Sequence, residues 1–138
     1  TAVKKQSPLF RGFDDVFYIP HSRHTENHLE DILDCPELEL LAVSDEAGLF
    51  GVKSADNRRF FIMGHPEYDR MTLDKEYRRD MAAGLNPEVP ENYYPEGNPE
   101  NRPSLTWRIH ANTLYTNWLN YYVYQTTPYD LYGTPWNS

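Results

Sequence analysis

Cysteine, basic residues and long apolar runs are all scarce in this chain, and each scarcity excludes a class of protein. The single cysteine, Cys35, excludes an internal disulfide and suits a reducing cytoplasm. Thirteen Lys and Arg residues against 21 Asp and Glu residues give a net charge of −8, so we expect no nucleic-acid partner. No apolar run approaches the roughly 20 residues of a membrane span, and the N-terminus does not resemble a signal peptide. We therefore expect no membrane segment.

The residues that are present predict a single α/β unit over residues 1–138. Short runs rich in aromatic and β-branched residues predict strands over 16–19, 38–43, 49–52 and 60–63. The last three of these strands form a predicted antiparallel meander. Apolar spacing predicts helices over 26–33, 72–83 and 104–125. The chain then divides into a lead-in (1–9), strands and helices (10–85), a proline-rich loop (86–103), a long helix (104–125) and a tail (126–138).

The two longer helices carry end signals and apolar stripes. Thr72 is a candidate N-cap and Gly84 a left-handed stop for the helix over 72–83, and Ser104 is a candidate cap for the long helix. A buried stripe is predicted on the first of them at Leu73, Tyr77 and Met81. The stripe on the long helix favours a core or packing face over a carbohydrate platform; its residues are Trp107, Ala111, Leu114, Trp118, Tyr121 and Tyr122.

Residues 59–69 give the strongest chemical signal. A short apolar strand ends at Gly64, and Pro66 favours an extended conformation for His65. Since residues i and i+2 of an extended chain point the same way, His65 and Glu67 can lie side by side. A carboxylate orients an imidazole in this way within a nucleophilic triad. The alternative is that the two are loop residues sharing a surface hydrogen bond.

A second apolar run, 16–19, also ends in a segment that bears histidine, so we expect one shared cleft. The hydroxyl of Ser22 is a candidate contact for a small polar substrate, unless it satisfies the local backbone in a turn. Arg79 is either a solvated helix residue or a bidentate clamp on a substrate carboxylate.

Three histidines in one segment, His21, His24 and His28, raise the possibility of a metal site. Their spacing matches no strong zinc signature, and no cysteine or carboxylate pattern completes it. We therefore predict that the chain binds no metal.

Several segments, taken in order, resemble one family. They are Arg-Gly-Phe-Asp-Asp (11–15), Pro-His-Ser-Arg (20–23), Gly-His-Pro-Glu-Tyr-Asp (64–69), Thr-Leu with Glu76 and Arg79-Asp80 (72–80), and Asn-Trp-Leu-Asn-Tyr-Tyr-Val-Tyr-Gln (117–125). The set is similar to the C-terminal part of homoserine O-acyltransferase, an enzyme of methionine biosynthesis, from about Arg11 to Leu131. The resemblance implies the α/β sandwich of the class I glutamine amidotransferases, which is flavodoxin-like, with the meander at the sheet edge and a long C-terminal helix.

The resemblance also implies roles for individual residues. His65 matches the general base of the family, and Glu67 matches the acidic residue that orients it. Ser22 matches a residue that contacts homoserine, and Arg79 matches the arginine that holds the amino-acid substrate. The implied substrates are L-homoserine and, as co-substrate, acetyl-CoA or succinyl-CoA, with no cofactor. The resemblance further implies a homo-oligomer, a dimer, for the full-length enzyme.

One member of the implied catalytic triad is not found. In the family the acyl group is carried on a cysteine upstream of all the segments above, whereas Cys35 precedes a proline outside any strand-to-helix elbow. We interpret Cys35 as structural and expect the chain alone to be inactive. Two other hypotheses remain: a non-catalytic interaction or assembly domain with an aromatic docking helix, and a polysaccharide binder, which predicts strongly exposed Trp107 and Trp118.

Overall fold

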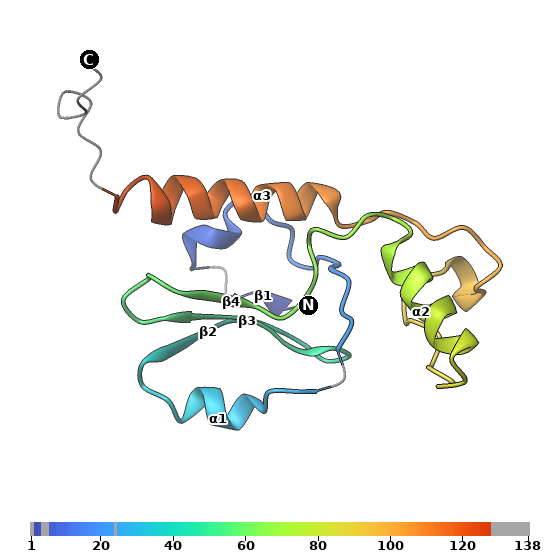
Figure 1. Cartoon of the computed structure of the whole chain (residues 1–138). Helices are drawn as coiled ribbons and strands as arrows, with labels where there is room; N and C mark the ends of the chain where they lie inside the picture. The colour runs from blue at the N-terminus through green and yellow to red at the C-terminus, as the bar shows by residue number, and fades with distance from the viewer. Residues whose placement is uncertain (1, 4–5, 24, 128–138) are drawn as a thin grey trace, which may run out of the picture.

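The computed structural model describes residues 2–3, 6–23 and 25–127 of the chain. One antiparallel sheet lies at its centre, in the order β1 (Ala2–Val3), β2 (Leu38–Ser44), β3 (Gly48–Ser54) and β4 (Phe60–Ile62) (Figure 1). Val52 of β3 is paired in register with Leu40 of β2 and with Phe61 of β4. The antiparallel meander predicted between residues 38 and 63 is therefore confirmed.

The sheet does not by itself show the larger fold that the resemblance implied. A flavodoxin-like sandwich is built on a parallel sheet, whereas every strand pairing among the described residues is antiparallel. The structure supports the α/β class and the meander, and the glutamine amidotransferase-like sandwich is not shown.

The predicted strand over 16–19 is wrong, because none of these residues joins a strand ladder. Its side chains alternate as a strand's do: Phe17 is buried, while Val16 and Tyr18 are more than half exposed. The burial pattern arises because the segment crosses the core rather than lying beside another strand. Its backbone meets the rest of the chain where Pro20 O accepts a hydrogen bond from His65 N, at 2.7 Å.

Two of the three predicted helices begin later than the sequence predicts, and the helix predicted over 72–83 begins at its predicted residue. The helices are α1 (Leu29–Leu33), α2 (Thr72–Ala82) and α3 (Arg108–Trp118), with α3 continuing as the π-helical turn η3 (Leu119–Val123). Single 3₁₀ turns, η1 (Pro8–Phe10) and η2 (Pro95–Gly97), complete the set. The tail predicted over 126–138 falls mostly outside the described residues.

Two of the predicted caps are wrong, and one is confirmed. Helix α2 begins after Met71 without a side-chain cap, so Thr72 is its first residue rather than its cap. Helix α3 starts after Trp107 instead of Ser104, because the indole of Trp107 is drawn into the core before the helix begins. Gly84, with a φ of +73°, supplies the predicted left-handed stop after α2.

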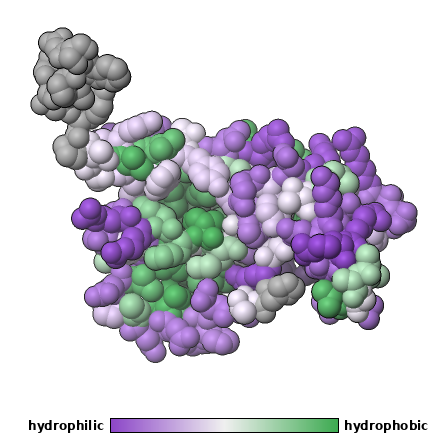
Figure 2. Space-filling view, viewed as in Figure 1, coloured by the Kyte–Doolittle hydropathy of each residue, from purple (hydrophilic) through white to green (hydrophobic). Residues whose placement is uncertain are grey.

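Two apolar clusters hold the chain together. Helix α3 and η1 cover the sheet through a cluster that contains Leu9, Phe10, Phe17, Leu41, Ala42, Phe50 and Leu114. A second cluster, Tyr93, Tyr94 and Trp107, packs with Leu73 and Tyr77 of α2. Ile19 packs against both clusters, so the segment 16–19 connects them. On the face seen in Figure 2, apolar side chains gather over the sheet beneath α3, and the part holding α2 is mainly hydrophilic.

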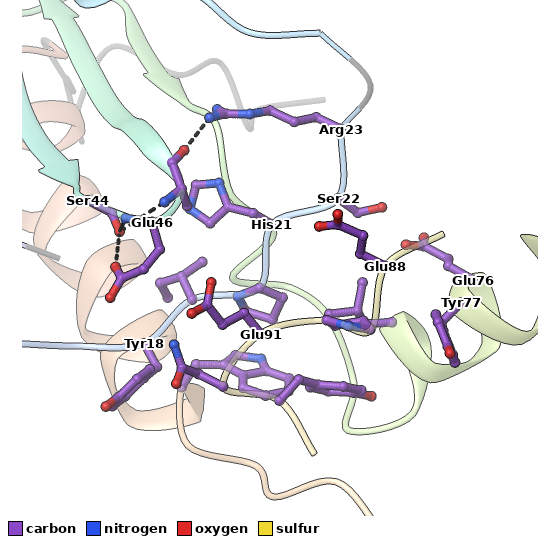
Figure 3. A pocket seen from close by; sticks show the side chains of 18 of the residues that line it. Tyr18, His21, Ser22, Arg23, Ser44, Glu46, Glu76, Tyr77, Glu88 and Glu91 are labelled. Atoms are coloured by element: carbon purple, nitrogen blue, oxygen red, sulfur yellow. Dashed lines mark hydrogen bonds between the residues drawn. The ribbon is translucent and has the colours of Figure 1, made fainter. Parts of the chain in front are cut away.

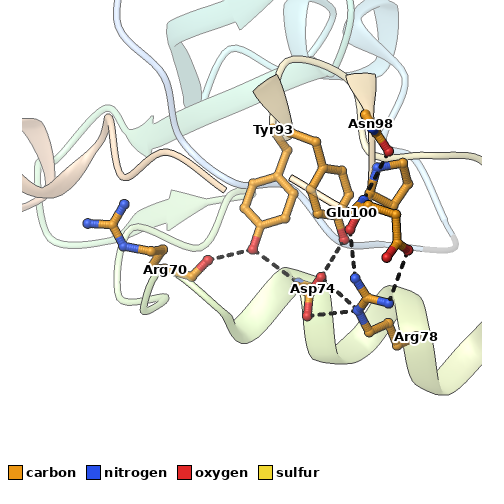
Figure 4. Close-up of polar contacts among 8 residues, drawn as sticks. Arg70, Asp74, Arg78, Tyr93, Asn98 and Glu100 are labelled. Carbon is orange, nitrogen blue, oxygen red and sulfur yellow. Dashed lines mark hydrogen bonds and ion pairs between the residues drawn. The ribbon is translucent and has the colours of Figure 1, made fainter. Parts of the chain in front are cut away.

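A buried carboxylate fixes the proline-rich loop on α2 (Figure 4). Asp74, only 5% exposed, accepts a hydrogen bond from the Tyr94 hydroxyl at 2.8 Å and pairs with Arg78 at 3.0 Å. The Tyr93 hydroxyl accepts from the Asp74 backbone N–H at 3.1 Å, and Arg78 also donates to Pro99 O. Burial raises the pKa of Tyr94 first, and its hydrogen bond to Asp74 raises it further. The proline-rich loop is therefore held against the helix. Met81, placed by prediction in the stripe of α2, is instead 45% exposed.

Candidate active site

His65 and Glu67 lie in contact just after β4. The backbone leaves the sheet through a hydrogen bond from Met63 N to Phe50 O, and His65 N then donates to Pro20 O, both at 2.7 Å. The Nδ1 atom of His65 is 2.9 Å from Glu67 Oε1. Because a carboxylate only accepts, this contact requires a proton on Nδ1 and leaves Nε2 as the atom able to take up another. The side chains are 33% and 56% exposed, so the pair can reach a ligand.

Gly64 allows the two histidine-bearing segments to meet. A Cβ at this position would lie 2.8 Å from Ile19 Cγ2 and 3.1 Å from both Pro20 O and His21 Nε2. Such contacts exclude any larger residue unless the backbone shifts. The close approach brings His65 Nε2 to 3.4 Å from the Ser22 carbonyl oxygen. The two histidine-bearing segments are therefore in contact, whereas neither His65 nor Glu67 is among the residues that line the neighbouring cavity.

A cavity of about 720 Å³ opens beside this junction (Figure 3). Its wall is formed by the segment 16–23, the α2 residues Glu76 and Tyr77, and the proline-rich loop from Pro87 to Tyr93. Ser22 and Glu76 face the same part of the cavity, and Glu91 lies on the other side, near Tyr18. The volume lies within the range of small-molecule and cofactor sites.

His21 is a half-buried member of the cavity wall. Burial lowers its pKa to about 4, with further contributions from the charges of Arg23 and His65. Its Nδ1 atom has no hydrogen-bond partner among the described residues. Arg23 itself donates to the carbonyl oxygens of Ala47 and Leu49. No group of three or more potential metal ligands gathers within the described ranges, and His24, the middle member of the histidine set considered above, lies outside them.

Arg79 lies outside the set of residues that line the cavity. Its guanidinium is 66% exposed and pairs with Asp80 at 2.8 Å, and Asp80 does line the cavity. The hydrogen bond and charge of Asp80 raise the pKa of Arg79, with a smaller contribution from Glu76. Cys35 is partly buried in the turn between α1 and β2, away from the cavity wall.

Tyr68 and Glu76, for which the sequence predicts no role, complete the surroundings of His65. The Tyr68 ring stacks on the imidazole, and its hydroxyl donates to Glu76 Oε1 at 2.7 Å. Burial, followed by this hydrogen bond, raises the pKa of Tyr68 to about 12, so the phenol stays protonated at neutral pH. Both residues stand in the segments that carry the family resemblance, and that position was the available signal.

Comparison with known proteins identifies related enzymes. The family model described as homoserine O-succinyltransferase matches residues 1–129. A homoserine O-acetyltransferase of Lachnoclostridium phytofermentans is 58% identical over 94% of this chain, and one of Brevibacillus brevis is 58% identical over 95%. A homoserine O-succinyltransferase of Shewanella sp. is 56% identical over 95%. The chain covers 43%, 43% and 42% of the lengths of these relatives, respectively.

Neither of the other hypotheses gains support from these results. Trp107 is buried, with its Nε1 donating to Tyr68 O at 2.9 Å, which contradicts the exposure that polysaccharide binding predicted. The related proteins are named as acyltransferases and not as interaction or assembly domains. The interaction-domain hypothesis therefore has no support from them. Among the described residues no helix is both long and apolar enough to cross a membrane.

Proposed function

The chain belongs to the homoserine O-succinyltransferase family, and we propose that it supplies the general base for acyl transfer to L-homoserine in a protein of its relatives' full length. The observation that carries the proposal is the 2.9 Å contact between His65 Nδ1 and Glu67 Oε1. Neither residue lines the cavity of substrate size, but Ser22, whose carbonyl oxygen lies 3.4 Å from His65 Nε2, does. The acyl donor is acetyl-CoA or succinyl-CoA. Relatives named for each of the two transfers match this chain almost equally well, so the described residues do not select between them.

The proposed chemistry has two half-reactions and needs a cysteine outside this chain. In the first, the thiolate of that cysteine attacks the thioester carbonyl, an acyl–enzyme bond forms, and CoA leaves. In the second, the hydroxyl of homoserine gives its proton to His65 Nε2 while its oxygen attacks the acyl group. The carbon–sulfur bond to the cysteine then breaks and the product ester leaves. Throughout, Glu67 accepts the hydrogen bond from Nδ1 and stabilises the imidazolium that forms.

Ser22 and Arg79 are the proposed contacts for homoserine. Ser22 lines the cavity, and its carbonyl oxygen lies 3.4 Å from His65 Nε2, which supports a position close to the reacting hydroxyl. Arg79 is largely exposed, so its guanidinium can exchange Asp80 for a substrate carboxylate at little desolvation cost. A planar guanidinium suits two parallel hydrogen bonds to such a carboxylate.

Further parts of the proposal concern the whole enzyme. We propose a glutamine amidotransferase-like sandwich, a homodimer, and a place in methionine biosynthesis in the cytoplasm, with no cofactor besides the acyl-CoA co-substrate. The low cysteine content supports a reducing compartment. Exposed aromatic residues on the long helix, Tyr115 and Trp118, support a contact between subunits.

The test is the release of CoA thiol from acetyl-CoA and from succinyl-CoA, measured with and without L-homoserine. We expect a protein of full family length to release CoA in steady turnover that depends on homoserine, and the 138-residue chain alone to release none. Homoserine-dependent turnover by the chain alone would contradict the proposed division of the triad, and Cys35→Ser would then show whether Cys35 is the nucleophile.

A further inference from the structure

Glu67 fixes only one edge of the His65 ring. The hydrogen bond at Nδ1 and the long 3.4 Å contact of Nε2 with Ser22 O hold the edges of the imidazole, and both His65 and Glu67 are partly exposed. The plane of the ring, and with it the direction of Nε2, the atom that takes the proton in the proposed reaction, therefore depends on a contact with the face of the ring. Misplacement of a reacting group by about 1 Å can cost roughly 10²-fold in rate.

That face contact is made by the ring of Tyr68. Its centroid lies 4.4 Å from that of the imidazole, and the two planes differ by 15°. A flat partner at this distance covers one face of His65 and fixes the plane of the ring. When His65 takes up a proton, the new positive charge also lies over the face of an aromatic ring, where it is stabilised.

Tyr68 is itself held at both ends. Its hydroxyl donates to Glu76 Oε1 on α2 at 2.7 Å. Its carbonyl oxygen accepts from the indole N–H of Trp107 at 2.9 Å, and Trp107 is 3% exposed. Glu76 and Trp107, both outside the loop that carries His65, thus fix the position of Tyr68.

We propose that Tyr68 is a positioning residue for His65 and that Glu76 anchors Tyr68 through its hydroxyl. The kinetic consequence rests on the proposed function of His65 as base, whereas the stacked geometry does not. The two parts are therefore tested by separate measurements on the full-length protein.

The first measurement is the proton NMR resonance of His65 Hε1, identified by its loss in His65→Gln. Stacking on an aromatic face shifts this resonance upfield. We expect the shift to persist in Tyr68→Phe, which keeps the ring, and to be lost in Tyr68→Leu. Tyr124→Leu, the same change at an exposed tyrosine, is the matched control and should leave the resonance in place. A resonance unmoved in Tyr68→Leu would overturn the stacking.

The second measurement is the steady-state rate of homoserine-dependent CoA release. Tyr68→Leu should lower kcat about 10- to 100-fold, with the KM of both substrates close to wild type, because the base is misdirected while the substrate contacts remain. Tyr68→Phe should recover most of the loss, and Glu76→Gln should lie between the two. A lost NMR shift with unchanged kcat would overturn the positioning role. Absence of transfer by the wild type would instead overturn the proposed function, and the NMR result would still decide the stacking.

Discussion

His21 shows how strongly position alters a single side chain in this molecule. It lies one residue before Ser22, yet burial lowers its pKa to about 4, whereas an ordinary histidine titrates near 6.5. At neutral pH it is an uncharged part of the cavity wall. It therefore places no fixed positive charge next to His65, which the proposed mechanism requires to become positive itself.

The lowered pKa of His21 predicts a loss of stability in acid. Between pH 6.5 and about 4 the unfolded chain binds a proton at this site and the folded chain does not, so the free energy of unfolding falls as the pH falls. The slope from one such group is at most about 1.4 kcal/mol per pH unit, and partial exposure of the ring reduces it. Above pH 6.5 the group contributes nothing.

Urea denaturation between pH 7 and pH 4 measures this dependence. His21→Gln should flatten the decline, and His28→Gln, at an exposed histidine, should leave it as in the wild type. Equal slopes for the wild type and His21→Gln would contradict the assignment.

At the residue scale, the sequence predicted contacts that depend on local geometry and missed those that depend on distant segments. His65 and Glu67 are two residues apart around a proline, so their contact follows from backbone conformation alone. The stacking of Tyr68 depends on anchors supplied by Glu76 and by Trp107, 39 residues away. No local pattern encodes such a contact.

At the scale of elements, Asp74 joins α2 to the proline-rich loop that walls the cavity. Asp74→Ala leaves the buried Tyr94 hydroxyl without its acceptor and removes the partner of Arg78. We expect the free energy of unfolding to fall by about 2–3 kcal/mol, as for a buried hydrogen bond to a charged group. The midpoint of urea denaturation is the measurement.

Asp69→Ala is the matched control for Asp74, because Asp69 is 89% exposed and its contact with Arg108 spans 3.7 Å. It should cost less than about 0.5 kcal/mol, as surface substitutions do. Similar losses for the two variants would show that Asp74 is not the link between helix and loop.

The elements that the sequence predicted well are those stabilised by their own pattern. The β2–β3–β4 meander and α2 follow from short apolar runs, turn residues and a glycine stop, and they appear within one or two residues of their predicted bounds. Residues 16–19 and 104–107 were mispredicted because tertiary packing uses their apolar side chains without regular structure. Phe17 and Trp107 are both buried in the core clusters, and neither segment lies in a strand or helix.

At the scale of the whole molecule, the two ends of the described chain are tied together. The buried amide of Asn117 on α3 donates to Leu9 O at 2.9 Å and to Arg11 O at 2.8 Å, and Tyr122 contacts Ser7 at 3.2 Å. The segment that leads to the cavity is therefore fixed against the long helix. Since the chain spans less than half the length of its relatives, this part contains the residue that we propose as the base and not a whole active site.

The most direct test of the central claim is the turnover of His65→Ala in a protein of full family length, measured as homoserine-dependent CoA release. We predict that the rate falls by about 10²–10⁴-fold, the usual contribution of a general base, and that Glu67→Ala causes a smaller loss through a misoriented ring. His110→Ala, which breaks another histidine–carboxylate pair, 3.1 Å from Asp14, should retain turnover. Wild-type turnover in folded His65→Ala would contradict the account.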